Sequence, residues 1–497
     1  MLQLSIQGVM TVEKIYDVII VGSGVVGSAV ARELSRYKLN IAVLEKELDV
    51  CSETSGRNSG VLHAGFNNRT GSLMAKYCVE GCLGFDQVAK ELNIPFKRTG
   101  KMVVGFNEED LAKLKSLKEQ GDKNGVPGLE IVGKDQIKSL APHIGGEFAL
   151  YSPMTGILNP FIYTIALAEN AHKNGAEFFL DHEVTSIHRS ENLYWVNTKK
   201  QQFRTKWVIN CAGLNSDKIA KMFGIDDYTI YPCRGEYFIL DQKAGQYLEM
   251  PAYPVPNIKV GGLGIHITPS IDGNILVGPS TEYIDEKDNY ASTQKIMDLL
   301  IQDGGKIFPY LKREYFIRNF TGIRPKLVGE NEGGYADFVI EKRKSIPNSI
   351  HLVGIESPGL TSAIPLARRV VELIAQDQSL TENKNFDPDQ KGIMNFKEQT
   401  TEMKRTLIEK DANYGEIICR CETITKAEIL EAIHNPLGVD TVVGIKNRTR
   451  AMMGRCQGGY CQTRISELIL EEKMKSESEI LYSRNGSNMF VGKVRSL

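Results

Sequence analysis

The chain lacks an excess of charge of either sign, because 60 Lys and Arg residues stand against 61 Asp and Glu residues and the formal net charge is -1. Proteins that bind nucleic acid or anionic membrane surfaces through their overall field carry a marked positive excess. The balance therefore predicts no nucleic-acid partner. Any site for an anion must be local.

No stretch of the sequence reaches the roughly 20 uninterrupted apolar residues that a membrane-spanning helix needs. The most apolar stretch, residues 15–34, is broken by glycines and by Asp17. The first fourteen residues also lack the basic start and the small-residue cleavage site of a secretory signal. We therefore expect a cytoplasmic protein in which any membrane contact comes through a partner.

Cysteine is present at nine positions in a chain without a recognisable leader, which indicates a reducing compartment. The thiols are then expected to bind metal or to fill core space. With 497 residues, of which 42% are hydrophobic, the chain is long enough for two or three domains with a large core.

Two patterns alternate along the chain. Short β-branched runs ending in glycine, at residues 16–21, 206–213 and 349–357, predict buried strands of one parallel sheet. Segments such as RGEYFILD and GIHITPSIDGNILVG predict an interleaved antiparallel sheet. The expected fold is α/β, with a Rossmann-like dinucleotide-binding domain at 14–84, 150–229 and 341–380, and a substrate domain at 85–149 and 230–340.

The remainder of the chain has a different composition. Residues 381–412 are charged and poor in apolar side chains, which predicts a linker. Residues 413–475 carry four of the cysteines and two helical segments, TKAEILEAIHN and QTRISELILEEKMK, and predict a small α-helical domain. Residues 476–497 form a C-terminal tail.

Residues Gly22–Gly27 match the pattern G-x-G-x-x-G between a predicted strand and a predicted helix. In this pattern Gly22 allows a tight turn, Gly24 lets a pyrophosphate approach the backbone, and Gly27 packs the helix on the strand. Glu45 ends the next predicted strand and can accept ribose hydroxyls. The pattern predicts a dinucleotide site without separating FAD from NAD.

The segment SGRNSGVLHAG (residues 55–65) resembles the glycine oxidase/D-amino-acid oxidase (DAO) superfamily of flavoproteins, and within it the glycerol-3-phosphate and L-2-hydroxyglutarate oxidoreductases. The resemblance continues through GSLMAKYCVEG, CRGEYF, DGNILVGPS, GIRPK and IESPGLTSAIPLA, over residues 15–375. It implies that the cofactor is FAD. We expect the cofactor contacts at Gly22, Gly24, Gly27, Glu45, Lys46, Ser55, Asn58, Ser59, Gly60, Val184, Ala212, Gly213, Gly354, Gly359, Leu360 and Thr361.

His63 lies in a glycine-flanked loop, which is an unusual position for a core histidine. The resemblance implies that it is the base that takes the substrate hydroxyl proton while hydride passes to flavin N5. An imidazole suits this task because its ordinary pKa, about 6.5, is close to working pH. An alcohol needs such a base more than an amine does, so His63 favours a hydroxy substrate.

Arg324, in the segment GIRP, matches the family's arginine that pairs with the anionic group of the substrate, phosphate or carboxylate alike. The chain has Leu263 where some glycerol-phosphate oxidases have lysine, and its GLGIHIT stretch is closer to the hydroxyglutarate group. Further candidates for substrate binding are His266, Thr268, Arg234 and Ser357.

Cys419, Cys421, Cys456 and Cys461 form a C-x-C pair followed at a distance by C-x4-C. Four thiolates suit Zn²⁺ or a [2Fe-2S] cluster, but structural zinc sites usually begin with two to four residues between paired cysteines. Through IICRCETITKAEI and RTRAMMGRCQGGYCQTRI the segment resembles the bacterioferritin-associated-ferredoxin-like (BFD-like) [2Fe-2S] domain. The nearby basic residues Lys446, Arg448, Arg450 and Arg455 are expected to compensate a negative cluster or to dock an acidic partner.

Together these features predict an FAD-dependent dehydrogenase that oxidises a small anionic 2-hydroxy compound, foremost sn-glycerol 3-phosphate to dihydroxyacetone phosphate. The alternatives are L-2-hydroxyglutarate or a similar hydroxy acid, an amine of the proline, sarcosine or opine type, and a redox-relay subunit with an idle substrate site. Because a thiolate-bound cluster accepts electrons one at a time, we expect an electron-acceptor subunit. This subunit is a second flavoprotein or an iron-sulfur protein, including a quinone-linked one. We also expect a hetero- or homo-oligomer.

Overall fold

The computed structural model describes residues 14–256 and 264–492. Its first sheet is centred on β1 (Ile15–Val21), which pairs in parallel with β2 (Ile41–Leu44) and β12 (Gln202–Asn210). β20 (Ser349–Val353) is parallel to β12, so the three predicted strands share one sheet, as expected. The sheet also contains β9 (Glu177–Phe179), β10 (Val184–Ser190), β11 (Leu193–Thr198) and β19 (Val339–Glu341).

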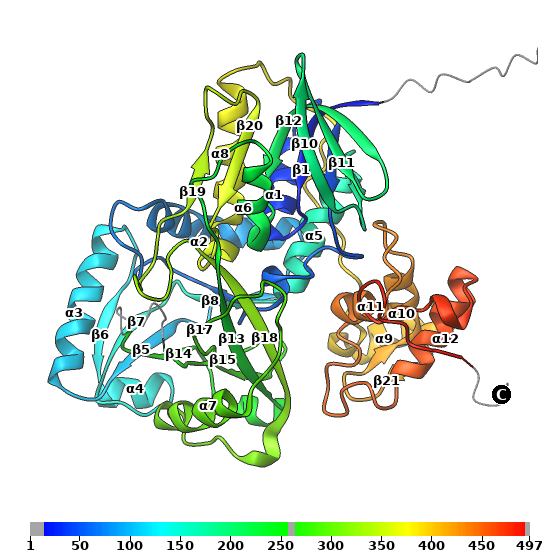
Figure 1. Ribbon diagram of the computed structural model, residues 1–497. Helices are drawn as coiled ribbons and strands as arrows, with labels where there is room; N and C mark the ends of the chain where they lie inside the picture. Colours follow the sequence, from blue (N-terminus) through cyan, green and yellow to red (C-terminus); the bar gives the residue numbers. More distant parts are fainter. Residues whose placement is uncertain (1–13, 257–263, 493–497) are drawn as a thin grey trace, which may run out of the picture.

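Helices cover this sheet in the upper part of Figure 1. α1 (Val25–Leu34) packs against α5 (Pro160–Lys173) and α8 (Gly359–Ala375), and α2 (Leu73–Glu91) packs against α8. α6 (Ser216–Lys221) contacts β20. The buried Val and Ile runs of β1, β2 and β20 explain this arrangement, because a sheet with two apolar faces needs cover on both.

The second sheet is mainly antiparallel. Its long central strand β13 (Tyr231–Leu240) pairs antiparallel with β18 (Phe316–Lys326) from Tyr231 opposite Lys326 to Leu240 opposite Phe316. One pair, β14 with β5, is parallel. The other strands of this sheet are β5 (Lys101–Gly105), β6 (Glu130–Gly133), β7 (Phe148–Ser152), β14 (Ala252–Pro254), β15 (Ile267–Pro269), β16 (Ile275–Val277) and β17 (Glu282–Tyr283). The helices that contact it are α3 (Glu108–Lys123), α4 (Lys134–Leu140) and α7 (Gln294–Ile307).

The chain passes between the two sheets several times, and a small sheet of β3 (Val61–Leu62), β8 (Gly156–Leu158) and β4 (Phe96–Lys97) lies at the crossing. α2 continues across the boundary predicted at residue 84, and β7 lies across the one predicted at residue 149. The domain ranges stay predictions in their details, while the interleaved α/β fold is confirmed.

The C-terminal domain contains the two helices expected from the sequence, α10 (Lys426–Ile433) and α12 (Gln462–Lys473), with α11 (Val442–Thr449) between them and a short hairpin of β21 (Ile417–Cys419) and β22 (Ile424–Thr425). α10 begins with a capping box, in which the Thr425 hydroxyl accepts from the Glu428 amide and the Glu428 carboxylate accepts from the Thr425 amide. Apolar side chains of these helices form a separate core.

Residues 381–412 do more than connect two domains. The Asn383 amide donates to the Arg36 carbonyl at 2.7 Å, and the Gln390 amide donates to the Glu91 carbonyl at 2.8 Å. The segment ends with α9 (Thr401–Lys410), in which no residue is buried. The low apolar content predicted a linker, but the structure shows that its first half is fixed to the dinucleotide domain.

The basic residues of the C-terminal domain bind the rest of the chain. Arg448 is buried and donates to both oxygens of Asp49, at 2.7 and 3.0 Å, while its Nε lies 3.6 Å from Glu169. Arg450 pairs with Asp272, and Arg455 pairs with Asp241. Three of the four basic residues therefore pair with acidic residues elsewhere in the same chain, rather than with the acidic partner protein that the sequence suggested. These pairs hold the cysteine domain beside the larger body in Figure 1.

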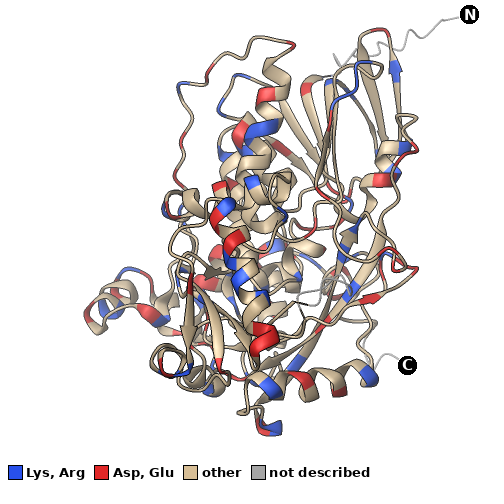
Figure 2. Ribbon diagram, turned by 90° about the vertical axis from the view of Figure 1, so that its left-hand side faces the viewer, with Lys and Arg blue, Asp and Glu red and all other residues tan. Residues whose placement is uncertain are grey.

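Both signs of charge alternate along the elements in Figure 2, as expected from the balanced composition. Among residues 14–256 and 264–492, no helix is long and apolar enough to cross a membrane.

The buried Arg448–Asp49 pair gives the first prediction. Replacing Asp49 by Asn leaves the Arg448 guanidinium buried with only the more distant Glu169, and we expect a loss of about 3 kcal/mol of stability at the domain interface. Urea unfolding, together with limited proteolysis of residues 381–412, measures this loss. The control is Glu109→Gln, which breaks an exposed pair with Lys113. A midpoint for Asp49→Asn equal to that of the control would contradict the proposed role.

Candidate functional site

The turn between β1 and α1 has no room for a side chain at Gly22 or Gly27. Gly22 has a φ of +100°, and a Cβ there would lie 2.6 Å from the Cys211 carbonyl oxygen. A Cβ on Gly27 would lie 2.0 Å from the Gly22 carbonyl oxygen. Contacts shorter than 3.0 Å exclude any larger residue, so the geometry accounts for two of the three predicted glycines.

Polar groups around this turn are already oriented. Glu45, at the end of β2, accepts hydrogen bonds from the amide and hydroxyl of Ser23, at 2.7 and 2.9 Å. Burial raises the pKa of Glu45. The N-cap of α1, Gly24, has no capping side chain, and the next amide, Val25 N–H, donates to Ser55 Oγ at 2.9 Å. The start of α1 thus presents a helix N-terminus of the kind that binds phosphate.

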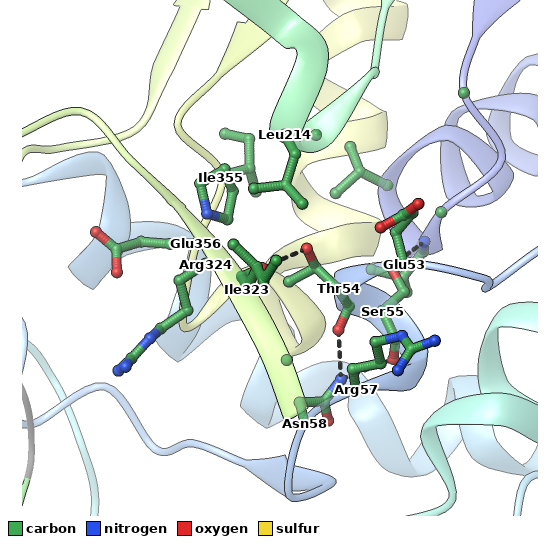
Figure 3. Close-up of a pocket in the computed structure, with 18 of the residues that line it drawn as sticks. Glu53, Thr54, Ser55, Arg57, Asn58, Leu214, Ile323, Arg324, Ile355 and Glu356 are labelled. Atoms are coloured by element: carbon green, nitrogen blue, oxygen red, sulfur yellow. Dashed lines mark hydrogen bonds between the residues drawn. The ribbon is translucent and has the colours of Figure 1, made fainter. Parts of the chain in front are cut away.

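A cavity of about 510 Å³ extends from this turn to the second sheet. In Figure 3, Glu53 and Arg57 lie at one end, and Arg324 and Glu356 point toward the other. Sixteen of the predicted site residues line it, namely Gly22, Gly24, Glu45, Lys46, Ser55, Asn58, Ser59, Val184, Ala212, Gly213, Gly359 and Leu360 for the cofactor, and His63, His266, Arg324 and Ser357 for the substrate.

Six predicted residues do not line the cavity: Gly27, Gly60, Gly354, Thr361, Thr268 and Arg234. Three of them shape its wall. Gly60 N–H donates to Asn58 Oδ1 at 2.9 Å, Gly354 adopts a φ of +68°, and Thr361 Oγ1 accepts from the His63 amide at 3.0 Å. Arg234 is instead paired with Glu282, so the geometry does not favour it as a substrate ligand. Leu263 lies outside the described residues.

His63 lies on the cavity wall, and no hydrogen bond to its ring is found in the described structure. Burial, with a smaller effect of the Lys101 cation, lowers the pKa of His63 to about 3. The ring is therefore neutral at physiological pH and can accept a proton. The sequence suggested an ordinary imidazole pKa, and the lower value follows from desolvation, which disfavours the cation.

Beside His63 three side chains form a stack. The His266 ring lies parallel to Tyr253, with centroids 3.7 Å apart, and Lys101 Nζ lies 3.6 Å from the Tyr253 centroid. Two groups this close to one ring centroid must occupy opposite faces. The His266 Nδ1–H donates to the Gly264 carbonyl at 2.9 Å, because a carbonyl can only accept, and this leaves Nε2 as an acceptor.

Among the residues that the structure describes, Arg324 has no acidic hydrogen-bond partner. Its Nη2 donates to the Ser280 carbonyl at 2.8 Å and to Thr281 Oγ1 at 3.4 Å. Neither acceptor neutralises the guanidinium, so its charge is available for an anion in the cavity. The role of Arg324 as the ligand of the substrate anion stays a prediction.

Sequence reasoning missed an ion pair in the same wall. Lys326 Nζ lies 3.2 Å from each oxygen of Glu356, and both side chains are almost completely buried. Both residues occur in motifs noted in the sequence, GIRPK and IESPGL, but within two positions of the residues predicted there, Arg324 and Ser357. A charged side chain within an apolar strand or glycine turn was the signal that could have revealed them. Lys101, in the strand KMVVG, was missed in the same way.

The four cysteines of the C-terminal domain are arranged as two pairs. Cys421 Sγ lies 3.5 Å from Cys456 Sγ, and Cys419 forms a hydrogen bond with Cys461 that lowers the pKa of Cys419 to about 6. Two thiolates bound to one tetrahedral metal ion at about 2.3 Å lie roughly 3.8 Å apart. Each pair can therefore hold one iron, as the two ends of a [2Fe-2S] cluster require.

A mononuclear site would need a different arrangement. Within residues 14–256 and 264–492, no group of three or more His, Cys, Asp or Glu side chains converges as one metal ion requires. Cys419 and Cys461 are buried, whereas Cys421 is exposed. The pairing therefore suits the two irons of a binuclear cluster and places the Cys421 pair toward solvent. Cys51, Cys78, Cys82, Cys211 and Cys233 are buried elsewhere, as expected for core residues.

The residues fit both groups that the sequence implied. The glycine-rich turn and the start of α1 suit the pyrophosphate, and Glu45 suits the ribose. The cavity continues past the start of α8 to His63 and Arg324. A family comparison identifies the same two parts. Residues 17–373 match the family "FAD dependent oxidoreductase" (DAO), and residues 417–471 match the "BFD-like [2Fe-2S] binding domain". The chain belongs to the DAO family of FAD-dependent oxidoreductases and carries a BFD-like [2Fe-2S]-binding domain.

Two individual relatives and one solved structure are similar to this chain over most of its length. The chain is 38% identical to a glycerol 3-phosphate dehydrogenase of Caloramator mitchellensis over 97% of this chain and 99% of that protein. It is 31% identical to an L-2-hydroxyglutarate dehydrogenase of Indibacter alkaliphilus over 72% of this chain and 98% of that protein. Among solved structures, FAD-bound L-α-glycerophosphate oxidase of Mycoplasma pneumoniae superposes with a TM-score of 0.71 and 30% identity, covering 76% of this chain and 98% of that one.

The crowded turn at Gly27 gives a second prediction. In Gly27→Ala the new methyl group meets the Gly22 carbonyl, and we expect FAD binding to weaken by about 1–3 kcal/mol. FAD released per chain on denaturation, and fluorescence titration of the apoprotein, measure the effect. Gly84→Ala in α2 is the matched control, because a Cβ there meets nothing within 4 Å. Equal FAD content in the two variants would refute the assignment of the turn.

The cysteine pairs give a third prediction. Cys421→Ser removes one thiolate of the Cys421–Cys456 pair, and we expect loss of the cluster, measured by iron and acid-labile sulfide analysis and by visible absorption. FAD content is unaffected because the cavity lies in another domain. Cys82→Ala, which removes a buried thiol outside the C-terminal domain, retains the iron. Zinc without iron in the anaerobically purified wild-type protein would be evidence against a cluster.

Proposed function

We propose that the protein oxidises sn-glycerol 3-phosphate to dihydroxyacetone phosphate and passes the electrons through its [2Fe-2S] domain to a partner. The observation that carries the proposal is the meeting, in one cavity, of a neutral histidine base and an arginine without an acidic hydrogen-bond partner. The relative that matches nearly the whole chain, both domains included, supports the choice of substrate.

The chain's own residues divide the work. Arg324 binds the phosphate group, to which its planar guanidinium can donate two parallel hydrogen bonds. His63 accepts the proton of the hydroxyl group at C2. An anion bound nearby raises the pKa of His63 from its low value in the free site, so substrate binding makes the base stronger. Bound FAD would supply the hydride acceptor, so that loss of the hydroxyl proton to His63 and of the hydride from C2 would leave the ketone.

The C-terminal cysteine domain is the proposed route by which electrons leave the protein. The oxidation would release two electrons, and a [2Fe-2S] cluster held by the four cysteines would supply a one-electron carrier that passes them on in two steps. The exposure of Cys421 supports an exit on that side of the domain. We propose as acceptor a second flavoprotein or an iron-sulfur protein, including a quinone-linked one. It would assemble with this chain in a cytoplasmic complex that reaches a membrane only through that partner.

L-2-Hydroxyglutarate is the second candidate substrate. It is favoured by His266, which lines the cavity from the GLGIHIT segment, and by relatives such as the Indibacter alkaliphilus enzyme. A steady-state screen with an artificial electron acceptor, covering glycerol 3-phosphate, L-2-hydroxyglutarate, proline and sarcosine, ranks the candidates. We expect the highest kcat/KM with glycerol 3-phosphate. Turnover of the amines with neither hydroxy compound oxidised would refute the proposal.

A fourth prediction concerns the base. In His63→Asn we expect kcat/KM for glycerol 3-phosphate to fall by about 10²–10⁴-fold, because proton removal from the hydroxyl loses its acceptor. FAD content and its absorption spectrum stay as in the wild type. His188→Asn, an exposed histidine on β10, is the control and retains full activity. Unchanged flavin reduction by glycerol 3-phosphate in His63→Asn would refute the assignment of His63 as the base.

A further inference from the structure

One member of the buried Lys326–Glu356 pair, Glu356, belongs to the cavity lining. Glu356 lines the cavity beside Ser357, whereas Lys326 lies behind it. The Lys326 ammonium is 3.2 Å from both carboxylate oxygens, and their side chains are 0% and 2% exposed. Figure 3 shows Glu356 and Arg324 on the same side of the cavity.

The two charged groups at this end of the cavity favour opposite partners. Arg324 donates to a carbonyl and a hydroxyl oxygen, so it retains its positive charge for a ligand. Glu356 is an ion-paired carboxylate with unused acceptor capacity, since a carboxylate has about four lone-pair directions and the ammonium fills only part of them. A ligand that spans both groups needs an anion toward Arg324 and a hydrogen-bond donor toward Glu356.

We propose that Glu356, held by Lys326, accepts a hydrogen bond from the second, non-reacting hydroxyl of a polyol phosphate. This inference rests on the proposed function, and it makes Glu356 a determinant of substrate specificity. The phosphate binds Arg324, the reacting hydroxyl faces His63, and the terminal hydroxyl binds Glu356. A hydroxy dicarboxylate in the same orientation places its second carboxylate against Glu356, where like charges in a desolvated site repel.

Three contacts around one carbon also fix its handedness. The substrate carbon C2 carries the phosphate arm, the hydroxymethyl arm, the reacting hydroxyl and the hydrogen that leaves as hydride. When Arg324, Glu356 and His63 engage the first three, only one enantiomer presents the hydrogen to the cofactor. Glu356 therefore contributes to stereoselectivity as well as to the choice between substrate classes.

A thermodynamic cycle tests the proposal in the FAD-loaded, full-length protein. The wild type and Glu356→Gln are each assayed for kcat/KM with glycerol 3-phosphate and with 2-hydroxypropyl phosphate, which lacks the terminal hydroxyl. Because Glu356→Gln removes the counter-ion of Lys326, the double variant Glu356→Gln/Lys326→Gln is assayed in parallel, with FAD content as a check on folding. Glu236→Gln, a buried carboxylate outside the cavity that accepts from Thr293, is the control.

We expect the wild type to prefer the substrate with the terminal hydroxyl by about 10- to 100-fold, the usual effect of one hydrogen bond to a charged group. In both Glu356 variants this preference collapses, activity with L-2-hydroxyglutarate rises relative to glycerol 3-phosphate, and discrimination between the glycerol-phosphate enantiomers weakens. Glu236→Gln keeps the wild-type preference.

Equal losses on both phosphates in the Glu356 variants would overturn the role of Glu356 and leave the proposed function intact. A wild type that fails to oxidise glycerol 3-phosphate, or that prefers L-2-hydroxyglutarate, would overturn the proposed function and this inference together. The two failures differ because the first appears only in the variants and the second appears in the wild type.

Discussion

The energetic cost of burying charge governs this protein more than any other single constraint. A charged group removed from water must find a partner, lose its charge or bind a ligand. Arg448 is neutralised by Asp49, which fixes the C-terminal domain to the dinucleotide domain. Glu356 is neutralised by Lys326. His63 has no such partner in the described part of the chain, and burial keeps it uncharged, which is the state that a proton acceptor requires.

The sequence predicted the architecture well where local patterns are strong. The β-branched runs at residues 16–21, 206–213 and 349–357 became parallel neighbours because strands with two apolar faces must lie inside a covered sheet. It did not reveal how the two parts of the chain dock. The acidic partner of Arg448 is Asp49, 399 residues away in sequence, and no local pattern encodes a contact of that range.

The site residues also divide into those that local motifs mark and those that only the folded structure reveals. Gly22, His63 and Arg324 were predictable because glycine turns and a family motif mark them directly, and all three line the cavity. Glu356 and Lys326 were missed because their importance comes from burial and mutual distance, which a sequence does not show. Arg234 shows the converse, because a charged residue inside a recognisable motif, CRGEY, is used to bind Glu282.

The central claim is that electrons enter through an alcohol at His63 and leave through the cysteine pairs. The most direct test adds glycerol 3-phosphate to the anaerobic protein and follows flavin absorbance together with the EPR signal of the cluster. We expect the flavin to bleach and the signal of a reduced [2Fe-2S] cluster to appear. Bleaching of the flavin while the cluster stays oxidised, although dithionite can reduce it, would show that electrons do not pass from the flavin to the cysteine pairs.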